Sequence, residues 1–378
     1  MKDDLGAFLD PLLDLTLAIQ QIPAPTFHED ERASFIRARF AGEGLADIDL
    51  DEVGNVYARL PGENPNLPLV ISAHLDTVFP GDTDLTASQE PGKITGPGIG
   101  DNSLGLAGLF GLVWALRQRQ RVLPFDLWLV ANTGEEGLGD LRGMKAVIQR
   151  FGKQALAYIV LEGMALGHIY VRGLGVRRYQ IKVQTEGGHS WVNYGRPSAI
   201  HELARLTTQL ADLELPANPR TTLNVGVISG GTSVNTIAAD ASLELDLRSE
   251  DGSALSRLDE QVQALVREAN CEQPQAVSVA SKVIGNRPFG EIHPEHPLVR
   301  LACRSLEAAG VQPSLSIGST DANVPLSLGL PAVCLGLTNG GRAHTKDEFI
   351  HTEPLLQGLK QCLALVEAAG EILPGKST

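Results

Sequence analysis

The chain lacks the features that define several common classes of protein. Its four cysteines form no CxxC pair, which argues against both a thiolate zinc site and a disulfide framework. It contains no GxSxG turn and no Walker-type loop, so the sequence gives no support to a serine-hydrolase or nucleotide-hydrolase mechanism. No apolar run approaches the roughly 20 residues that a membrane-spanning helix needs. These absences favour a protein whose cysteines are not paired in disulfides and which uses neither a serine nucleophile nor a phosphate-binding loop.

Basic residues are fewer than acidic ones. The 378 residues include 31 Lys and Arg against 45 Asp and Glu, which gives a net charge of −14. Nucleic acids and anionic membranes bind basic patches, so neither is expected as a partner. The first four residues, Met-Lys-Asp-Asp, lack the basic start of a signal peptide, and we expect a cytoplasmic protein.

Apolar strand-like runs alternate with helical stretches at both ends of the chain. Helices are predicted at residues 5–20, 29–41, 104–117, 297–309 and 354–371, and strands at residues 67–73, 125–131, 155–161 and 331–336. This alternation predicts an α/β domain, in which helices sandwich a mixed, mostly parallel sheet. The closing residues 374–378 are expected to fray.

The pattern changes in the middle of the chain. Residues 175–284 have the order strand, helix, strand, strand, helix, strand, which is typical of a small ferredoxin-like α+β domain. The simplest organisation is a discontinuous catalytic domain of residues 1–174 and 285–378, with residues 175–284 inserted into it as a second domain.

Candidate metal ligands stand at the ends of the predicted strands and in loops that follow them. Parallel sheets place ligands outside the carboxyl ends of their strands, so these side chains are expected to converge. Carboxylates and imidazoles can hold two zinc ions, which polarise a carbonyl and activate water for amide hydrolysis. The candidates are His74, Asp101, Glu135, Glu136, Glu162 and His344.

Each of these motifs is weak on its own. The His74–Asp76 pair is a common structural pattern, and the glycine-rich loop before Asp101 could equally be a plain turn or a phosphate loop, although GxGxGD differs from the GxGxxG of dinucleotide sites. Glu135 and Glu136 could form a solvated acidic turn. At the end of a buried strand, however, adjacent carboxylates repel each other and need a cation. One can then bind metal while the other takes a proton from water.

The complete series of motifs resembles a known family. Ser72-Ala73-His74-Leu75-Asp76, Gly98-Ile99-Gly100-Asp101, Thr133-Gly134-Glu135-Glu136, Glu162, Gly187-Gly188-His189-Ser190 and Ala343-His344 are similar to motifs of the zinc-dependent exopeptidases and deacylases. That family includes glutamate carboxypeptidase, peptidase T, acetylornithine deacetylase and succinyl-diaminopimelate desuccinylase. The resemblance covers essentially the whole chain.

The resemblance implies a role for each matching residue. Asp101 would bridge two metals, with His74 and Glu162 on one and Glu136 and His344 on the other. Glu135 would be the general base, and Asp76 would orient His74. In the inserted domain, a lid and dimerisation module in this family, His189 would stabilise the oxyanion across a dimer. Asn235 and Arg248 would hold the substrate, with Arg248 binding its carboxylate.

The sequence leaves three functions open. The first is a two-metal exopeptidase acting on short peptides, and the second is a deacylase acting on N-acyl amino acids. The third is a catalytically silent protein on the same fold, which the complete ligand set disfavours. Two zinc ions are expected, although nitrogen and oxygen ligands also accept cobalt or manganese. A homodimer through the inserted domain is expected as well.

Overall fold

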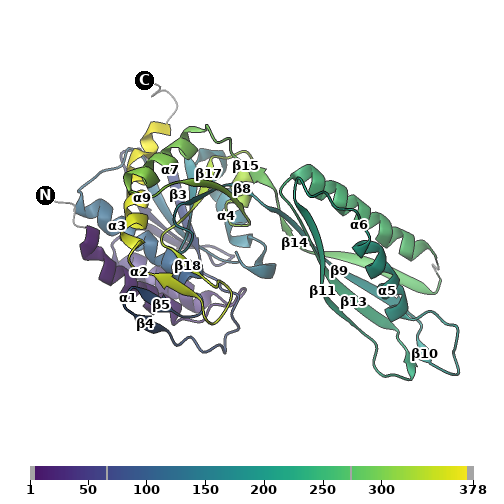
Figure 1. Cartoon of the computed structure of the whole chain (residues 1–378). Helices are drawn as coiled ribbons and strands as arrows, with labels where there is room; N and C mark the ends of the chain where they lie inside the picture. The colour runs from purple at the N-terminus through teal and green to yellow at the C-terminus, as the bar shows by residue number, and fades with distance from the viewer. Residues whose placement is uncertain (1–4, 65–66, 273–274, 373–378) are drawn as a thin grey trace. The chain divides into compact units, whose positions relative to one another are not determined.

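The computed structural model describes residues 5–64, 67–272 and 275–372. The acidic start at residues 1–4 and the expected fraying at residues 374–378 therefore lie outside the described residues. The chain divides into two compact units, one formed by Met1–Gly173 with Gly290–Thr378 and the other by Leu174–Phe289. We call them the main unit and the inserted unit (Figure 1).

A mixed nine-stranded sheet forms the centre of the main unit. Its strand order is β1-β2-β6-β3-β7-β17-β8-β15, and β16 pairs with β8. The central pairs β6–β3, β3–β7 and β7–β17 are parallel, whereas the pairs at β1, β2 and β15 are antiparallel. The strands are β1 (Ala46–Leu50), β2 (Val56–Leu60), β3 (Pro68–His74), β6 (Asp126–Asn132), β7 (Ala157–Glu162), β8 (His168–Gly173), β15 (Gly290–Glu291), β16 (Ser314–Gly318) and β17 (Ala332–Gly336).

Helices cover both faces of this sheet, as the sequence predicts. Helices α1, α3, α7 and α9 pack on one another, and α3 also packs on β3 and β7. Helix α2 packs on β1 and β2, and α4 packs on β6. The helices are α1 (Leu9–Gln20), α2 (Asp30–Gly42), α3 (Gly105–Gln118), α4 (Arg142–Phe151), α7 (Pro297–Ala308), α8 (Asn323–Ser327) and α9 (Leu355–Ala368).

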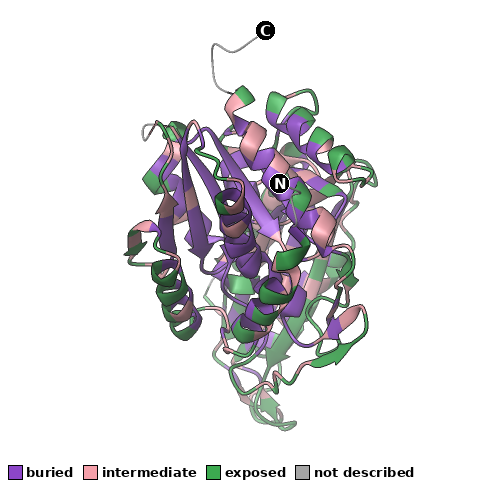
Figure 2. Ribbon diagram, turned by 90° about the vertical axis from the view of Figure 1, so that its left-hand side faces the viewer, coloured by how far each residue is buried: buried purple, intermediate pink, exposed green. Residues whose placement is uncertain are grey.

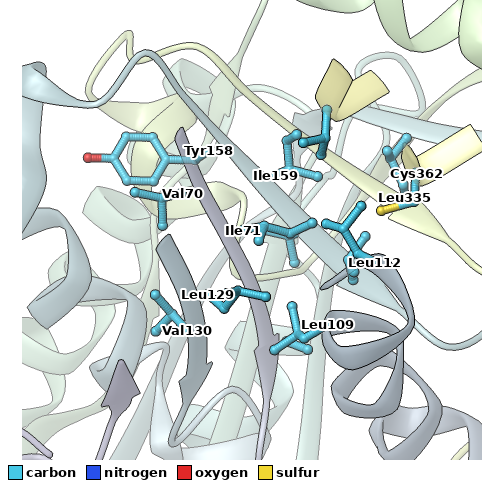
Figure 3. Packing of buried hydrophobic residues seen from close by; sticks show 14 of the residues in the cluster. Val70, Ile71, Leu109, Leu112, Leu129, Val130, Tyr158, Ile159, Leu335 and Cys362 are labelled. Carbon is cyan, nitrogen blue, oxygen red and sulfur yellow. The ribbon is translucent and has the colours of Figure 1, made fainter. Parts of the chain in front are cut away.

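The core fills the space between these layers. Alternate residues of a strand point to opposite faces, so Ile71 faces Leu109 and Leu112 of α3 while its neighbour Val70 lies on the other side with Tyr158 (Figure 3). All seven residues of β3 are buried, which is typical of a central parallel strand. Figure 2 shows that the strands of the large sheet are mostly buried. This packing fixes the strand ends that carry the candidate ligands.

A small second sheet completes the main unit. Its order is β18-β19-β5-β4, and it joins segments that are more than 240 residues apart in the chain. The sequence patterns gave no sign of it, because its strands are only two or three residues long. They are β4 (Ser88–Glu90), β5 (Lys93–Thr95), β18 (Gly340–Gly341) and β19 (Phe349–His351).

One expectation about membranes needs correction. The segment Ile99–Gln118 is long and apolar enough, by length and composition, to cross a membrane. However, 89% of its most apolar window is buried inside the protein, because α3 is the central helix of the core. A buried core helix passes the same test, so this segment is weak evidence for a membrane span.

The longer elements of the inserted unit follow the predicted order, and two short strands, β10 and β12, are additional. A four-stranded antiparallel sheet, in the order β11-β13-β9-β14, carries α5 and α6 on its apolar face. The unit extends beyond the expected residues 175–284 because β14 continues to Arg287, which pairs with Val176 of β9. The elements are β9 (Gly175–Thr185), β10 (Gly188–His189), α5 (Ala199–Ala211), β11 (Thr221–Gly230), β12 (Thr236–Ile237), β13 (Asp240–Ser249), α6 (Gly252–Glu272) and β14 (Val277–Arg287).

Candidate metal centre

Four ligand candidates lie along one edge of the large sheet. β3 ends at His74 and β7 ends at Glu162, while Glu135 and Glu136 follow the end of β6. Because β3 pairs in parallel with both β6 and β7, the carboxyl ends of the three strands meet at this edge.

Asp101 and His344 reach the same edge from a kinked helical segment, Ile99–Leu104, and from a turn, respectively. The Asp101 carboxylate lies between two imidazoles, with Oδ1 3.0 Å from His74 Nε2 and Oδ2 3.1 Å from His344 Nε2. Glu136 Oε1 is 3.1 Å from the same nitrogen of His344. Glu162 Oε2 is 3.7 Å from His74 Nε2. The two oxygens of Asp101 therefore face two different sets of side chains.

Three overlapping groups of these side chains could each hold a metal ion. Within each group the ligand atoms lie within 4.8 Å of one another. Asp101 belongs to two of the groups, so its carboxylate is placed to bridge two ions, and the nitrogen and oxygen donors suit zinc, cobalt or manganese. The groups are His74 with Asp101 and Glu162, Asp101 with Glu136 and His344, and His74 with Glu135 and Glu136.

The electrostatics of the site call for positive charge. Hydrogen bonds to Asp101 and Glu136 raise the pKa of His344 to about 10. Burial acts to lower the pKa of His74, but its three carboxylate neighbours raise it well above its usual range. Burial raises the pKa of Glu162 to about 7, although His74 opposes that shift. Metal cations bound among these side chains would offset the charge of the carboxylates.

Asp76 holds the loop that carries the two glutamates. It is buried, and its carboxylate accepts hydrogen bonds from the backbone N–H groups of Glu135 and Glu136, both at 2.9 Å. His74 Nδ1 is 2.9 Å from the backbone oxygen of Asp76 and 3.6 Å from its carboxylate. A bond from Nδ1–H to that backbone oxygen would leave Nε2 free to bind metal. Asp76 therefore contacts His74 mainly through its backbone.

Two buried side chains that are not among the predicted site residues hold the ligand segments. Asn102 donates to the backbone oxygen of Leu161 at 2.8 Å and accepts from the N–H of Gly163 at 2.9 Å, so it holds both neighbours of Glu162. Glu348 accepts hydrogen bonds from the backbone next to Asp101. Only the position of Asn102, directly after a ligand, could have drawn attention to it; no pattern marks Glu348.

The remaining candidates belong to the inserted unit. His189 and Asn235 are neighbours there, since β10 pairs with β12 and the Ser190 N–H donates to the backbone oxygen of Asn235 at 3.0 Å. Arg248 forms an ion pair with Asp246, with a distance of 2.6 Å between Nε and Oδ2. The structure thus brings His189 and Asn235 together within one unit.

Comparison with known proteins identifies the family. Residues 70–368 match the model described as peptidase family M20/M25/M40. The match covers most of the chain, and the protein belongs to this family. One relative is protein YqjE of Bacillus subtilis, which is 23% identical over 374 residues, covering 95% of this chain and 98% of YqjE. Another is acetylornithine deacetylase of Klebsiella pneumoniae, 27% identical over 75% of this chain and 76% of the relative.

Solved structures share the fold along nearly the whole chain. Aminopeptidase PepT from Bacillus cereus has a TM-score of 0.78 and 24% identity, covering 96% of this chain and 99% of its own. A tripeptidase from Staphylococcus aureus has a TM-score of 0.80 and 21% identity, with the same coverage. YxeP of Bacillus subtilis, a dinuclear metal-binding peptidase of the M20 family, has a TM-score of 0.70 and 17% identity, covering 97% of this chain and all of its own.

Family membership and the cluster of ligands together define the class of the protein. It is a metallohydrolase that acts on amide bonds of peptides or N-acyl amino acids.

Proposed function

We propose that the protein is a two-metal exopeptidase that removes a residue from short peptides. The observation that carries this proposal is the Asp101 carboxylate, whose two oxygens lie 3.0 and 3.1 Å from the imidazoles of His74 and His344. His74 and Glu162 would hold one ion, Glu136 and His344 the other, and Asp101 both. Bound there, two divalent cations, with zinc as the expected metal, would polarise the amide carbonyl and lower the pKa of water.

Glu135 supplies the proton transfer in this proposal. It is buried at the carboxyl edge of the sheet, and its carboxylate lies in a ligand group with His74 and Glu136. The Asp76 carboxylate holds its backbone N–H at 2.9 Å, which fixes the start of the side chain. Glu135 takes a proton from the attacking water and returns it to the leaving amine, as a general base and then a general acid.

The inserted unit would complete the reaction. His189 would stabilise the oxyanion that forms as the carbonyl is attacked. Asn235 and Arg248 would bind the substrate. The ion pair with Asp246 engages Nε of Arg248, and among the described residues its Nη groups have no acceptor. They are thus suited to a bidentate bond with a substrate carboxylate.

The inserted unit would also form a homodimer, with His189 acting across it. The support is a set of apolar side chains beside the two site residues. Trp191 is 86% exposed, Tyr194 is 90% exposed and Val234 is fully exposed. Apolar side chains gathered on a surface mark interaction sites. Sedimentation at micromolar concentration should show a dimer, and a monomer would remove the role of His189 across subunits. The cytoplasmic location remains a prediction that cell fractionation would test.

Glu135→Gln tests the chemistry. The amide keeps the size of the side chain but cannot accept the proton, so we expect a loss of about 100- to 10,000-fold in kcat. Metal content, measured on the same samples, should remain that of the unmodified protein. Glu52→Gln, an exposed position, is the matched control. If Glu135→Gln retains normal turnover, Glu135 is not the base.

A deacylase is the second candidate function, and the relationship to acetylornithine deacetylase favours it. The zinc- or cobalt-loaded protein should be given a tripeptide with a free amine and an N-acyl amino acid with the same C-terminal residue. Cleavage of the tripeptide alone supports the exopeptidase, and cleavage of the acylated compound supports the deacylase. If the metal-loaded protein cleaves neither substrate, the catalytically silent alternative gains support.

A further inference from the structure

Glu348 is a buried acid that the proposed reaction does not use. It lies four residues after His344, directly before β19, and its relative exposure is 0%. Its Oε1 accepts two backbone hydrogen bonds, from Gly100 N–H at 2.7 Å and from Asp101 N–H at 2.8 Å. Glu348 therefore bonds directly to the backbone of the proposed bridging ligand.

The backbone of Glu348 forms hydrogen bonds both to the turn that follows His344 and to the segment that precedes Asp101. Its N–H donates to the oxygen of Thr345 at 3.1 Å, which closes the turn that follows His344. Its carbonyl oxygen accepts the N–H of Gly96 at 2.8 Å, at the start of the loop that leads to Asp101. β19 continues this connection by pairing with β5. Glu348 is thus the point at which the His344 turn and the Asp101 loop meet.

Burying a carboxylate at this position is energetically unfavourable if the role of the side chain is only structural. Within the described residues Glu348 forms no ion pair, and Oε2 is buried without a hydrogen-bond partner. A glutamine could accept the same two hydrogen bonds without adding charge. A cation held beside Asp101 would offset a negative charge at this position.

We propose that Glu348 is a positioning residue of the metal centre, which holds the Asp101 segment and the His344 turn in place through the hydrogen bonds that it forms with both. The group of Asp101, Glu136 and His344 would then be assembled before the cation arrives. This inference rests on the proposed two-metal reaction. Some residues orient metal ligands by hydrogen bonds without binding the metal themselves. Replacing such a residue typically lowers metal affinity or activity by about 10- to 100-fold.

The test compares two substitutions of Glu348 with a neighbour. Glu348→Ala removes both the acceptor and the charge, while Glu348→Gln keeps the acceptor and removes the charge. Asp347→Ala is the matched control, since Asp347 is the adjacent acid and its side chain is 74% exposed. Zinc and cobalt affinities are measured by calorimetry on the metal-free full chain, with kcat and KM measured separately on the loaded enzyme.

We expect Glu348→Ala to weaken one of two metal-binding steps by about 10- to 100-fold and to lower kcat with little change in KM. Glu348→Gln keeps the hydrogen-bond acceptor and should stay close to the unmodified chain, and Asp347→Ala should match the unmodified chain. Excess cobalt should restore kcat of Glu348→Ala, which a purely structural loss would not allow. Circular dichroism of the metal-free proteins separates these results from unfolding.

Two results would overturn the inference. One is two binding steps of unmodified affinity in both Glu348 variants, because metal binding would then not depend on this side chain. The other is a Glu348→Ala protein whose thermal stability falls while its metal affinity does not, since that is a structural role only. If the unmodified chain itself binds only one ion, the two-metal proposal fails, and the result is distinguishable from a failure at Glu348.

Discussion

The sheet edge of the main unit and the surface around His189 in the inserted unit differ in how deeply most of their candidate site residues are buried. At the sheet edge, His74, Glu135 and Glu136 are buried, and Asp76 holds the two glutamates by their backbone N–H groups. In the inserted unit, His189 and Asn235 are exposed and lie beside exposed apolar side chains. The first region is a buried cluster of candidate metal ligands, whereas the second is an exposed surface rich in apolar side chains.

The largest effect should come from Asp101, the proposed bridging carboxylate. Asp101→Ala removes the ligand shared by two groups, so we expect at most one bound metal and a loss of kcat/KM of about 1000-fold or more, equivalent to several kcal/mol of metal-derived stabilisation. Metal content by mass spectrometry and kinetics on the same preparation check this. Asp82→Ala, at an exposed position, is the control. Retention of two metals by Asp101→Ala would mean that the buried edge is not organised around this carboxylate.

His189→Ala should have a smaller effect of a different kind. Loss of one oxyanion donor typically costs about 100- to 1000-fold in kcat. Metal affinity should remain unchanged, because His189 belongs to none of the ligand groups formed by the described residues. Calorimetry and kinetics separate the two quantities, with the exposed His201→Ala as control. If His189→Ala lowers metal affinity as well as kcat, the two regions do not have separate roles.

The smallest effects concern stability, and two asparagines provide a matched pair. Asn102→Ala leaves the buried backbone groups of Leu161 and Gly163 without partners, which should cost about 1–3 kcal/mol each. Asn193→Ala removes only an exposed acceptor for the N–H of His189, and we expect a change within about 0.5 kcal/mol. Urea unfolding followed by fluorescence measures both free energies of unfolding. Equal losses would show that the two regions are equally preorganised.

Much of the fold could be predicted because its signals are local. The apolar run before His74 and the run before Glu162 each mark a buried strand, and the order of elements in residues 175–284 identifies the inserted α+β unit. The expected helices and strands agree with the structure to within a few residues. Where they differ, tertiary pairing decided the boundary, as at Arg287, which remains in β14 because it pairs with Val176.

The side chains that hold the candidate ligands in place could not be predicted in the same way. Asn102 bonds to residues 59 and 61 positions away, and Glu348 bonds to residues 248 and 247 positions away. No periodicity of apolar residues encodes such contacts, since hydrophobic patterns report only which side of an element is buried. The side chains involved are ordinary polar residues in loops, and only their burial sets them apart.

The sequence by itself determined the two-unit organisation, the parallel strands and the identity of the candidate ligands, because apolar periodicity and ligand chemistry are written into local stretches of the chain. The tertiary structure decided which oxygen of Asp101 faces which histidine. It also decided that the side chains of Asp76, Asn102 and Glu348 bond to the backbone of the segments that carry the ligands. The physical reason is burial. Once these segments are packed away from water, each backbone N–H and carboxylate must find a partner, and that partner comes from a distant part of the chain.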